Sequence, residues 1–124
     1  MTQTLVKNTI NKGDILVAQW GYEANNVNYF KVLKRTKTFV EIAEVEAEWV
    51  PGDTGIYDGR YVQPSNTFKN WSLWNDGTRV DNGQPIVLRR KVKTHADGGE
   101  YANLCEYAHI NIWNGRPQVD YNHH

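Results

Sequence analysis

The chain has 124 residues and a mass of 14.3 kDa, the size of one ordinary domain. Its hydrophobic content of 40%, with five tryptophans and seven tyrosines, excludes a disordered chain. Because 14 basic residues balance 14 acidic ones, the formal net charge is zero, and the basic excess of a general nucleic-acid binder is absent.

Cysteine content and hydropathy bear on the cellular setting. Cys105 is the single cysteine, so no disulfide can form within the chain, and a reducing, cytoplasmic setting is expected. The first nine residues lack the apolar core of a signal peptide, and no segment approaches the roughly 18 apolar residues of a membrane span. We therefore expect no membrane partner. His123 and His124 are either native or a purification-tag remnant, and they are set aside as site candidates.

Two hydrophobic runs near the N-terminus predict the first pair of strands. A turn at residues 11–14 leads into residues 15–20, which are too short and too rich in β-formers for a helix. Gly21 then marks a bulge or a close backbone approach. A second strand is expected over residues 27–35. Its apolar side chains fall on both faces, with Phe30 and Val32 on one and Val27, Tyr29 and Leu33 on the other.

The third predicted strand, residues 38–49, changes its hydrophobic phase midway. Val40 and Ile42 are apolar at even positions, whereas Val45, Ala47 and Trp49 are apolar at odd ones. One extra residue would keep both sets pointing inward, so we predict a bulge or sharp bend near Ala43-Glu44. A helix over residues 41–50 is the alternative, because the segment is rich in glutamate.

Residues 51–85 differ in composition, with many glycines, prolines and asparagines around several aromatic residues. They are predicted to form one long loop carrying a short hairpin or helical turn over residues 71–79, with Asp76-Gly77 as its turn.

The C-terminal third predicts further strands. Residues 86–94 form a fourth strand and residues 101–113 a fifth, with a turn at 97–100 between them. Asn114-Gly115 is a type I′ hairpin signal, which returns the chain into a last strand ending near Tyr121. The fold predicted for residues 1–124 is a single all-β domain, an open barrel or strongly bent antiparallel sheet of five to six strands with one long aromatic, glycine-rich loop.

Four short motifs occur in a fixed order along the chain. They are Trp20-Gly21-Tyr22-Glu23, Asn26-Val27-Asn28-Tyr29-Phe30-Lys31-Val32, Arg89-Arg90-Lys91-Val92 and Trp113-Asn114-Gly115-Arg116-Pro117. Through them, residues 13–36 and 86–121 resemble a family of short proteins of bacteriophages, prophages and related mobile elements. The resemblance covers about half of the chain, and residues 52–84 depart from it because the family's connection is usually shorter. It implies a small phage-type accessory protein and assigns no catalytic residue.

Aromatic residues around the first hairpin admit two interpretations. Trp20, Tyr22, Tyr29 and Phe30 could stack on bases or on a planar ligand, where each stacked base contributes roughly 1–3 kcal/mol. Alternatively, they build the core of a small barrel.

Basic residues form two clusters, Lys31, Lys34, Arg35 and Lys37 and then Arg89, Arg90, Lys91 and Lys93. Neighbouring strands could combine them into a phosphate-binding patch. For the first cluster we favour cross-strand pairing with the glutamates of the third strand, Glu41, Glu44, Glu46 and Glu48. The second cluster remains open between the two interpretations.

Catalytic and metal-binding patterns are weak. His95 and His109 lack the spacing of a zinc site and are interpreted as surface or core histidines. Cys105 and His109 would lie about 13 Å apart on one strand, too far for proton transfer. Neither a phosphate-binding loop nor a nucleophilic serine motif occurs. No metal, no cofactor and no enzymatic activity are therefore expected.

Aromatic residues of the loop give the predicted contact surface. We expect a non-enzymatic binding protein that inhibits or modulates a host protein or protein complex, in the host cytoplasm, through Tyr57, Tyr61, Trp71 and Trp74 with Arg89 and Arg116 as polar anchors. In the alternative interpretation, the loop packs down and plugs one end of the barrel.

Two other functions remain as alternatives. In the first, a small barrel binds single-stranded nucleic acid, with Tyr22 and Tyr29 stacking on bases and Arg89, Arg90 and Lys91 on phosphates. In the second, the protein is a sponge for a small nucleotide signal, which requires a deep aromatic pocket.

Overall fold

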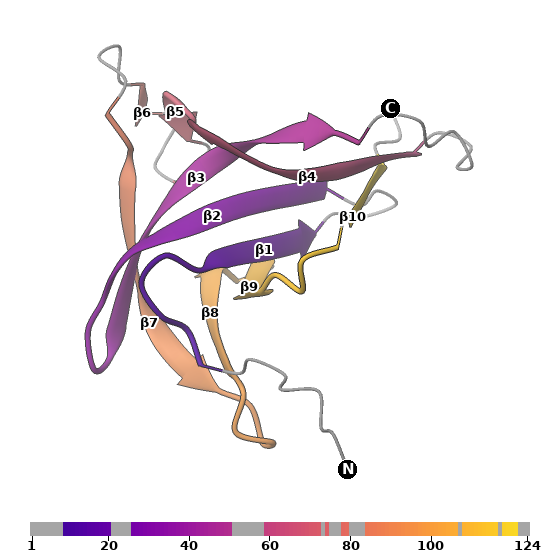
Figure 1. Cartoon of the computed structure of the whole chain (residues 1–124). Coiled ribbons are helices and arrows are strands. Elements are labelled where there is room, and N and C mark those ends of the chain that lie inside the picture. The colour runs from indigo at the N-terminus through magenta and orange to yellow at the C-terminus, as the bar shows by residue number, and fades with distance from the viewer. Residues whose placement is uncertain are drawn as a thin grey trace.

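The computed structural model describes residues 9–20, 26–50, 59–72, 74, 78–79, 84–106, 108–116 and 118–121 (Figure 1). Its regular elements are β-strands: β1 (Ile15–Trp20), β2 (Asn26–Arg35), β3 (Phe39–Trp49), β4 (Gly59–Phe68), β5 (Trp71–Ser72), β6 (Thr78–Arg79), β7 (Val87–Thr94), β8 (Glu100–Cys105), β9 (Ala108–Ile112) and β10 (Gln118–Tyr121). Within this described part, no helix is long and apolar enough to cross a membrane.

Strand β3 closes the sheet into a barrel. Strands β3, β2, β1, β9, β8 and β7 are hydrogen-bonded in that order, and the first half of β3, Phe39–Ala43, also pairs with β7. These six antiparallel strands form a closed barrel (Figure 1). The second half of β3 pairs with β4, and β10 adds to β4, so the sheet extends beyond the barrel. The predicted all-β barrel is confirmed, and it is closed rather than open.

Strand β2 has a hydrophobic core on each face, as its sequence predicts. Phe30 and Val32 point into the barrel, where they belong to its main core cluster. Tyr29 points outward and is also fully buried, because Val62 of β4 packs against this outer face. Together they belong to a second hydrophobic core cluster. Alternating side chains on one strand thus build two cores.

Of the bulge or sharp bend predicted near Ala43-Glu44, the pairing of β3 with β2 contradicts the bulge. Pairing between β3 and β2 is regular across that point, from Val32↔Ile42 to Tyr29↔Val45. No extra residue is needed, because the even positions of β3 face the barrel core and the odd ones face the second core. The register shifts come from extra residues in the partner strands. One shift lies between Val32 and Lys34 of β2, and the other lies in β4 between Pro64 and Phe68.

The segment predicted as a long loop contains a ten-residue strand, β4. Pro64 and the polar residues after it hide this strand in the sequence, because proline is depleted from strand interiors. In the structure Pro64 lies opposite Ala47, beside the register shift, where the ladder is already interrupted. The short hairpin predicted over residues 71–79 is confirmed as β5 paired with β6, and its Asp76-Gly77 turn lies outside the described residues.

The predicted fifth strand, residues 101–113, is instead a hairpin of β8 and β9. Cys105 pairs with Ala108 at the end of this hairpin. The register shifts between Asn103 and Cys105, and beyond this shift residues of equal parity lie opposite each other, such as Asn103 and His109. The odd–even alternation therefore continues from β8 into β9, which is why the pattern resembles one long strand. The hairpin predicted at Asn114-Gly115 is also wrong: β9 is already paired with β1 and β8, and β10 pairs with β4.

Different residues cover the core at the two ends of the barrel. At one end Ile10 is fully buried in the main core, and its backbone N–H donates to Glu100 Oε1 (2.9 Å). Arg35 Nη2 donates to Glu100 Oε2 (3.1 Å) at the same end. At the opposite end, Trp20 and Trp74 pack against the core with their rings edge to face, 5.3 Å between centroids.

Candidate functional site

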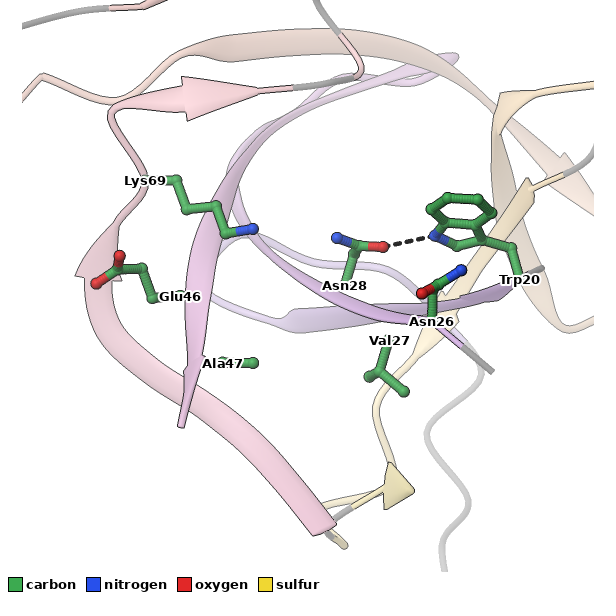
Figure 2. A pocket seen from close by; sticks show the side chains of 7 residues that line it. All are labelled: Trp20, Asn26, Val27, Asn28, Glu46, Ala47 and Lys69. Atoms are coloured by element: carbon green, nitrogen blue, oxygen red, sulfur yellow. Dashed lines mark hydrogen bonds between the residues drawn. The ribbon is translucent and has the colours of Figure 1, made fainter. Parts of the chain in front are cut away.

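A pocket of about 430 Å³ opens at the end of the barrel where β1 finishes and β2 begins (Figure 2). We call it the barrel-mouth pocket. It is lined by Trp20 from β1, Asn26, Val27 and Asn28 from β2, Glu46 and Ala47 from β3, and Lys69 from the segment after β4. Its volume lies in the range of roughly 300–1,000 Å³ that small-molecule sites occupy.

A chain of hydrogen bonds links the pocket wall to a buried carboxylate. Trp20 Nε1 donates to Asn28 Oδ1 (2.6 Å), as Figure 2 shows, and Asn28 Nδ2 donates to Glu44 Oε2 (2.8 Å). Lys69 Nζ pairs with the same carboxylate oxygen at 2.8 Å. Because the indole can only donate and the carboxylate accepts, the two ends of the chain fix the orientation of the Asn28 amide.

Glu44 occupies an inward position of β3 that normally carries an apolar residue. It follows Val40 and Ile42 on the barrel face and is only 5% exposed. Burying a carboxylate is costly unless it is paired and hydrogen-bonded, and here Lys69 and Asn28 meet both needs. Such a costly group in a small barrel marks the mouth as a candidate site.

Arg90 points to the opposite face of β7 from the other three residues of its basic cluster. It lies opposite Val40 on the inward face of β7, and its Nε donates to the Leu104 carbonyl (3.2 Å). Its Nη2 donates to the Trp74 carbonyl (3.4 Å), which ties the inserted tryptophan to the barrel wall. In this arrangement Arg90 is structural, so the predicted contact of Arg90 with phosphates is not supported.

The predicted stacking role of Tyr29 is corrected by its burial. The ring is fully buried in the second core, and its hydroxyl donates to the Val62 carbonyl (2.8 Å). Phe30 is likewise fully buried, so both residues follow the core interpretation. Tyr22, the other predicted stacking residue of the hairpin, lies outside the described residues.

The aromatic residues of the insert are not brought into one surface. Trp74 is half-buried against the barrel core, as the plug interpretation predicts, whereas Trp71 is 38% exposed on the β5–β6 hairpin. Tyr61 is half-buried on β4, and Tyr57 lies outside the described residues.

The two predicted polar anchors are both exposed. Arg89 lies on the outer face of β7, with its guanidinium 4.2 Å from the centre of the Phe39 ring. Arg116 lies in the turn after β9, where its backbone carbonyl accepts a hydrogen bond from Trp113 Nε1 (2.7 Å).

Ion pairing of the first basic cluster differs from the expectation. Arg35 pairs with Glu100 of β8 rather than with a glutamate of β3. Glu44 pairs with Lys69, which the sequence did not single out. Lys34 lies opposite Glu41 in the ladder, a register that is compatible with the predicted cross-strand pairing of this cluster.

His95, His109 and Cys105 do not form a catalytic or metal-binding group. His95 stacks on Tyr101, with ring centroids 4.1 Å apart, and His109 contacts Asn103 through Nδ1. Because β8 and β9 form a hairpin, Cys105 lies opposite Ala108 rather than on one strand with His109. Among the residues that the structure describes, no three histidine, cysteine or carboxylate side chains gather as a metal site.

Four polar residues of the site, Asn26, Asn28, Glu44 and Lys69, were not predicted as site residues. Alternation along β3 could have identified Glu44, because it continues the inward series of Val40 and Ile42. Lys69 carried no such signal, since it reaches the site only through the fold of the insert.

Comparisons with models of protein families, with curated proteins and with solved structures found no significant match to this chain.

Proposed function

We propose that this chain is a non-enzymatic binding protein whose barrel-mouth pocket holds a small planar heterocycle of the nucleobase class. The observation that carries the proposal is the partly buried chain of contacts from Trp20 through Asn28 to Glu44 and Lys69, which holds an aromatic and amide wall in place. Preorganised polar groups bind well because they lose little conformational freedom when a ligand arrives.

The pocket wall offers the contacts that a base requires. The indole of Trp20 provides an aromatic surface, and stacking of one base on an aromatic side chain contributes roughly 1–3 kcal/mol. Asn26 carries a donor and an acceptor side by side, a pair that matches the N6/N7 edge of adenine. Val27 and Ala47 supply the apolar part of the lining beneath these groups (Figure 2).

The charges at the mouth favour an uncharged ligand. Lys69 is the one cation among the lining residues, and Glu44 already neutralises it at 2.8 Å. Glu46 adds a further negative charge to the rim. A phosphate would meet no uncompensated cation in this lining, so a base or nucleoside fits better than a nucleotide.

Calorimetric titration with adenosine, guanosine, cytidine and uridine tests the proposal. We expect adenosine to bind with a dissociation constant below about 1 mM, and adenosine 5′-monophosphate to bind more weakly. Asn26→Leu keeps the size of the side chain and removes both polar contacts, so it should weaken binding about tenfold or more.

Asn66→Leu is the matched control, because Asn66 is an exposed asparagine on β4 that does not line the pocket. It should leave adenosine binding unchanged. If none of the four nucleosides binds, or if both variants bind adenosine like the wild type, the proposal is wrong.

A macromolecular partner is the second candidate. Trp71 supports it, because this large ring is 38% exposed on the β5–β6 hairpin, which is separate from the barrel sheet. The resemblance to phage and mobile-element proteins suits either candidate: an accessory protein could sequester a nucleobase compound or occlude a host protein. Capture of a host protein that is lost with Trp71→Ala and kept with Asn26→Leu would favour the second candidate.

A further inference from the structure

The outer face of β7 carries a row of cations. Arg89, Lys91 and Lys93 alternate with the inward residues Leu88, Arg90 and Val92, and all three cations are exposed. With a strand rise of about 3.3 Å per residue, the Cα atoms of neighbouring cations are about 7 Å apart. Each can therefore meet a different phosphate along an extended strand of nucleic acid.

Neighbouring strands leave most of this positive charge uncompensated. Lys91 lies opposite Phe39 of β3, and Lys93 lies opposite Tyr101 of β8. Arg89 lies opposite Glu41, the carboxylate that borders the row on β3. In the turn after β7, Asp97 accepts a hydrogen bond from the Gly99 N–H (2.9 Å). The row is thus a local basic stripe on a chain whose net charge is zero.

Aromatic rings lie directly beside the stripe, on β8, on β9 and in the turn after β7. His95 stacks on Tyr101 with an angle of 19° between the rings, and His109 meets the same ring edge-on at a centroid distance of 5.9 Å. His95 and His109 are both exposed. Because His95 is exposed and is backed by Tyr101, its ring is a surface on which a base can stack.

A hollow of about 370 Å³ continues this outer face beyond the rings. It is lined by Val17, Gln19, His109, Asn111, Ile112 and Asn114. His95 Nε2 lies 3.4 Å from Asn111 Oδ1, so the same amide borders both the rings and the hollow. The hollow provides polar edges for a second base next to the one on His95.

From this arrangement we infer that the outer face of β7, β8 and β9 binds single-stranded nucleic acid. Arg89, Lys91 and Lys93 contact successive phosphates, while His95, backed by Tyr101, stacks on a base. A row of cations and adjacent aromatic rings are the two components of general single-strand binding. An acidic protein segment is a less suitable ligand, because it would bind the cations but would not need the aromatic rings.

Fluorescence anisotropy with a labelled mixed-sequence DNA strand of about 15 nucleotides tests the inference. Three phosphate contacts predict that log K falls with log salt with a slope near −2, since each contact on a single strand contributes about −0.7. Lys91→Gln and Lys93→Gln should each move the slope about 0.7 closer to zero. Tyr101→Leu should weaken binding about tenfold and leave the slope unchanged.

Lys31→Gln is the matched control, because Lys31 is an exposed lysine on β2, which neighbours none of β7, β8 and β9. It should bind like the wild type. Circular dichroism checks that each variant is folded, and if Tyr101→Leu is not, His95→Ala at the exposed turn replaces it and should also weaken binding.

Three results would overturn the inference. One is no binding of the strand at about 50 mM salt, where phosphate contacts are strongest. The second is an equal loss of affinity in Lys31→Gln and Lys91→Gln. The third is competition by a poly-glutamate peptide as strong as that by the unlabelled strand, with the ring variants binding like the wild type. Asn26→Leu should bind DNA normally, so the inference does not depend on the barrel-mouth pocket.

Discussion

Glu44 is the residue whose position most needs an explanation. A leucine or valine there would continue the apolar series of β3 and avoid the cost of burying a charge. Glu44 instead accepts hydrogen bonds from two side chains that face the pocket, Asn28 and Lys69. Removal of the Glu44 carboxylate would leave the polar groups of Asn28 and Lys69 without this partner, which is costly inside a protein. Glu44 therefore holds both side chains in place.

Glu44→Gln tests this role at the level of a single carboxylate. The variant keeps the shape of the side chain and removes its charge, so its contacts with Lys69 and Asn28 weaken. We expect the free energy of unfolding, measured by urea denaturation, to fall by about 1–2 kcal/mol. This value is at the lower end of the range for hydrogen bonds to charged groups, because the Lys69 side chain is 30% exposed and its ammonium group can bind water instead.

Glu46→Gln is the control, since Glu46 lies two residues further along β3 and is exposed. Its effect should stay within about 0.5 kcal/mol. Equal destabilisation by the two variants would mean that the pairing of Glu44 contributes nothing to the fold.

Single residues of the site differ in how far the sequence predicts them. The alternation of β3 places Glu44 inward, and the same rule places Trp20 on the inward face of β1 after Leu16 and Ala18. The alternation along one strand does not predict which residue of another segment pairs with an inward-facing charge. Lys69 meets Glu44 only because β4 returns along β3, and Pro64 conceals that strand in the sequence.

At the scale of elements, the insert does two things that its composition suggested as alternatives. Trp74 closes the barrel end against Trp20, and its carbonyl is held by Arg90. Trp71, three residues earlier, is exposed on the β5–β6 hairpin. A glycine- and asparagine-rich composition is compatible with both environments, so the sequence could not separate them.

Stability measurements on Trp74→Ala and Trp71→Ala separate these two roles of the insert. Loss of the Trp74 ring opens a cavity against the barrel core, and we expect a destabilisation of about 2–4 kcal/mol. Loss of the Trp71 ring removes a partly exposed side chain and should cost less than about 1 kcal/mol. Thermal unfolding followed by circular dichroism measures both variants. A larger loss for Trp71→Ala than for Trp74→Ala would contradict the assignment of Trp74 as the plug.

Hairpins were predicted well where the turn has a strong sequence signal. The turn at residues 97–100 is confirmed, with Gly98 at a φ of +92°, a conformation that favours glycine. Gly115 has a similar φ of +85°, yet Asn114-Gly115 joins strands that are not neighbours. A turn signal reports local backbone conformation, whereas strand pairing depends on which edges are still free.

For the molecule as a whole, closure of the barrel is the feature that could not be predicted from the sequence. Alternation in each strand predicts which side chains face inward, and it identified the two faces of β2 correctly. Closure depends on the pairing of Phe39–Ala43 with β7, which joins segments more than 40 residues apart. No local pattern specifies such a contact.

Closure also separates two surfaces of opposite electrostatic character. The barrel-mouth pocket is lined by one lysine that a glutamate neutralises, and it suits an uncharged ring. The outer face of β7, β8 and β9 carries three exposed cations beside stacked rings. Because inward and outward residues alternate on β7, one barrel wall supplies Arg90 to the interior and its neighbours to the exterior.

A two-dimensional NMR titration of the wild-type protein with adenosine decides whether the barrel-mouth pocket binds a nucleobase. We expect the signals of the Trp20 indole N–H and of the Asn26 and Asn28 side-chain amides to shift in a saturable manner, while the signal of the Trp71 indole N–H does not move. If those pocket signals remain still at saturating adenosine, or if the changes centre on Trp71 instead, the barrel mouth is not the binding site.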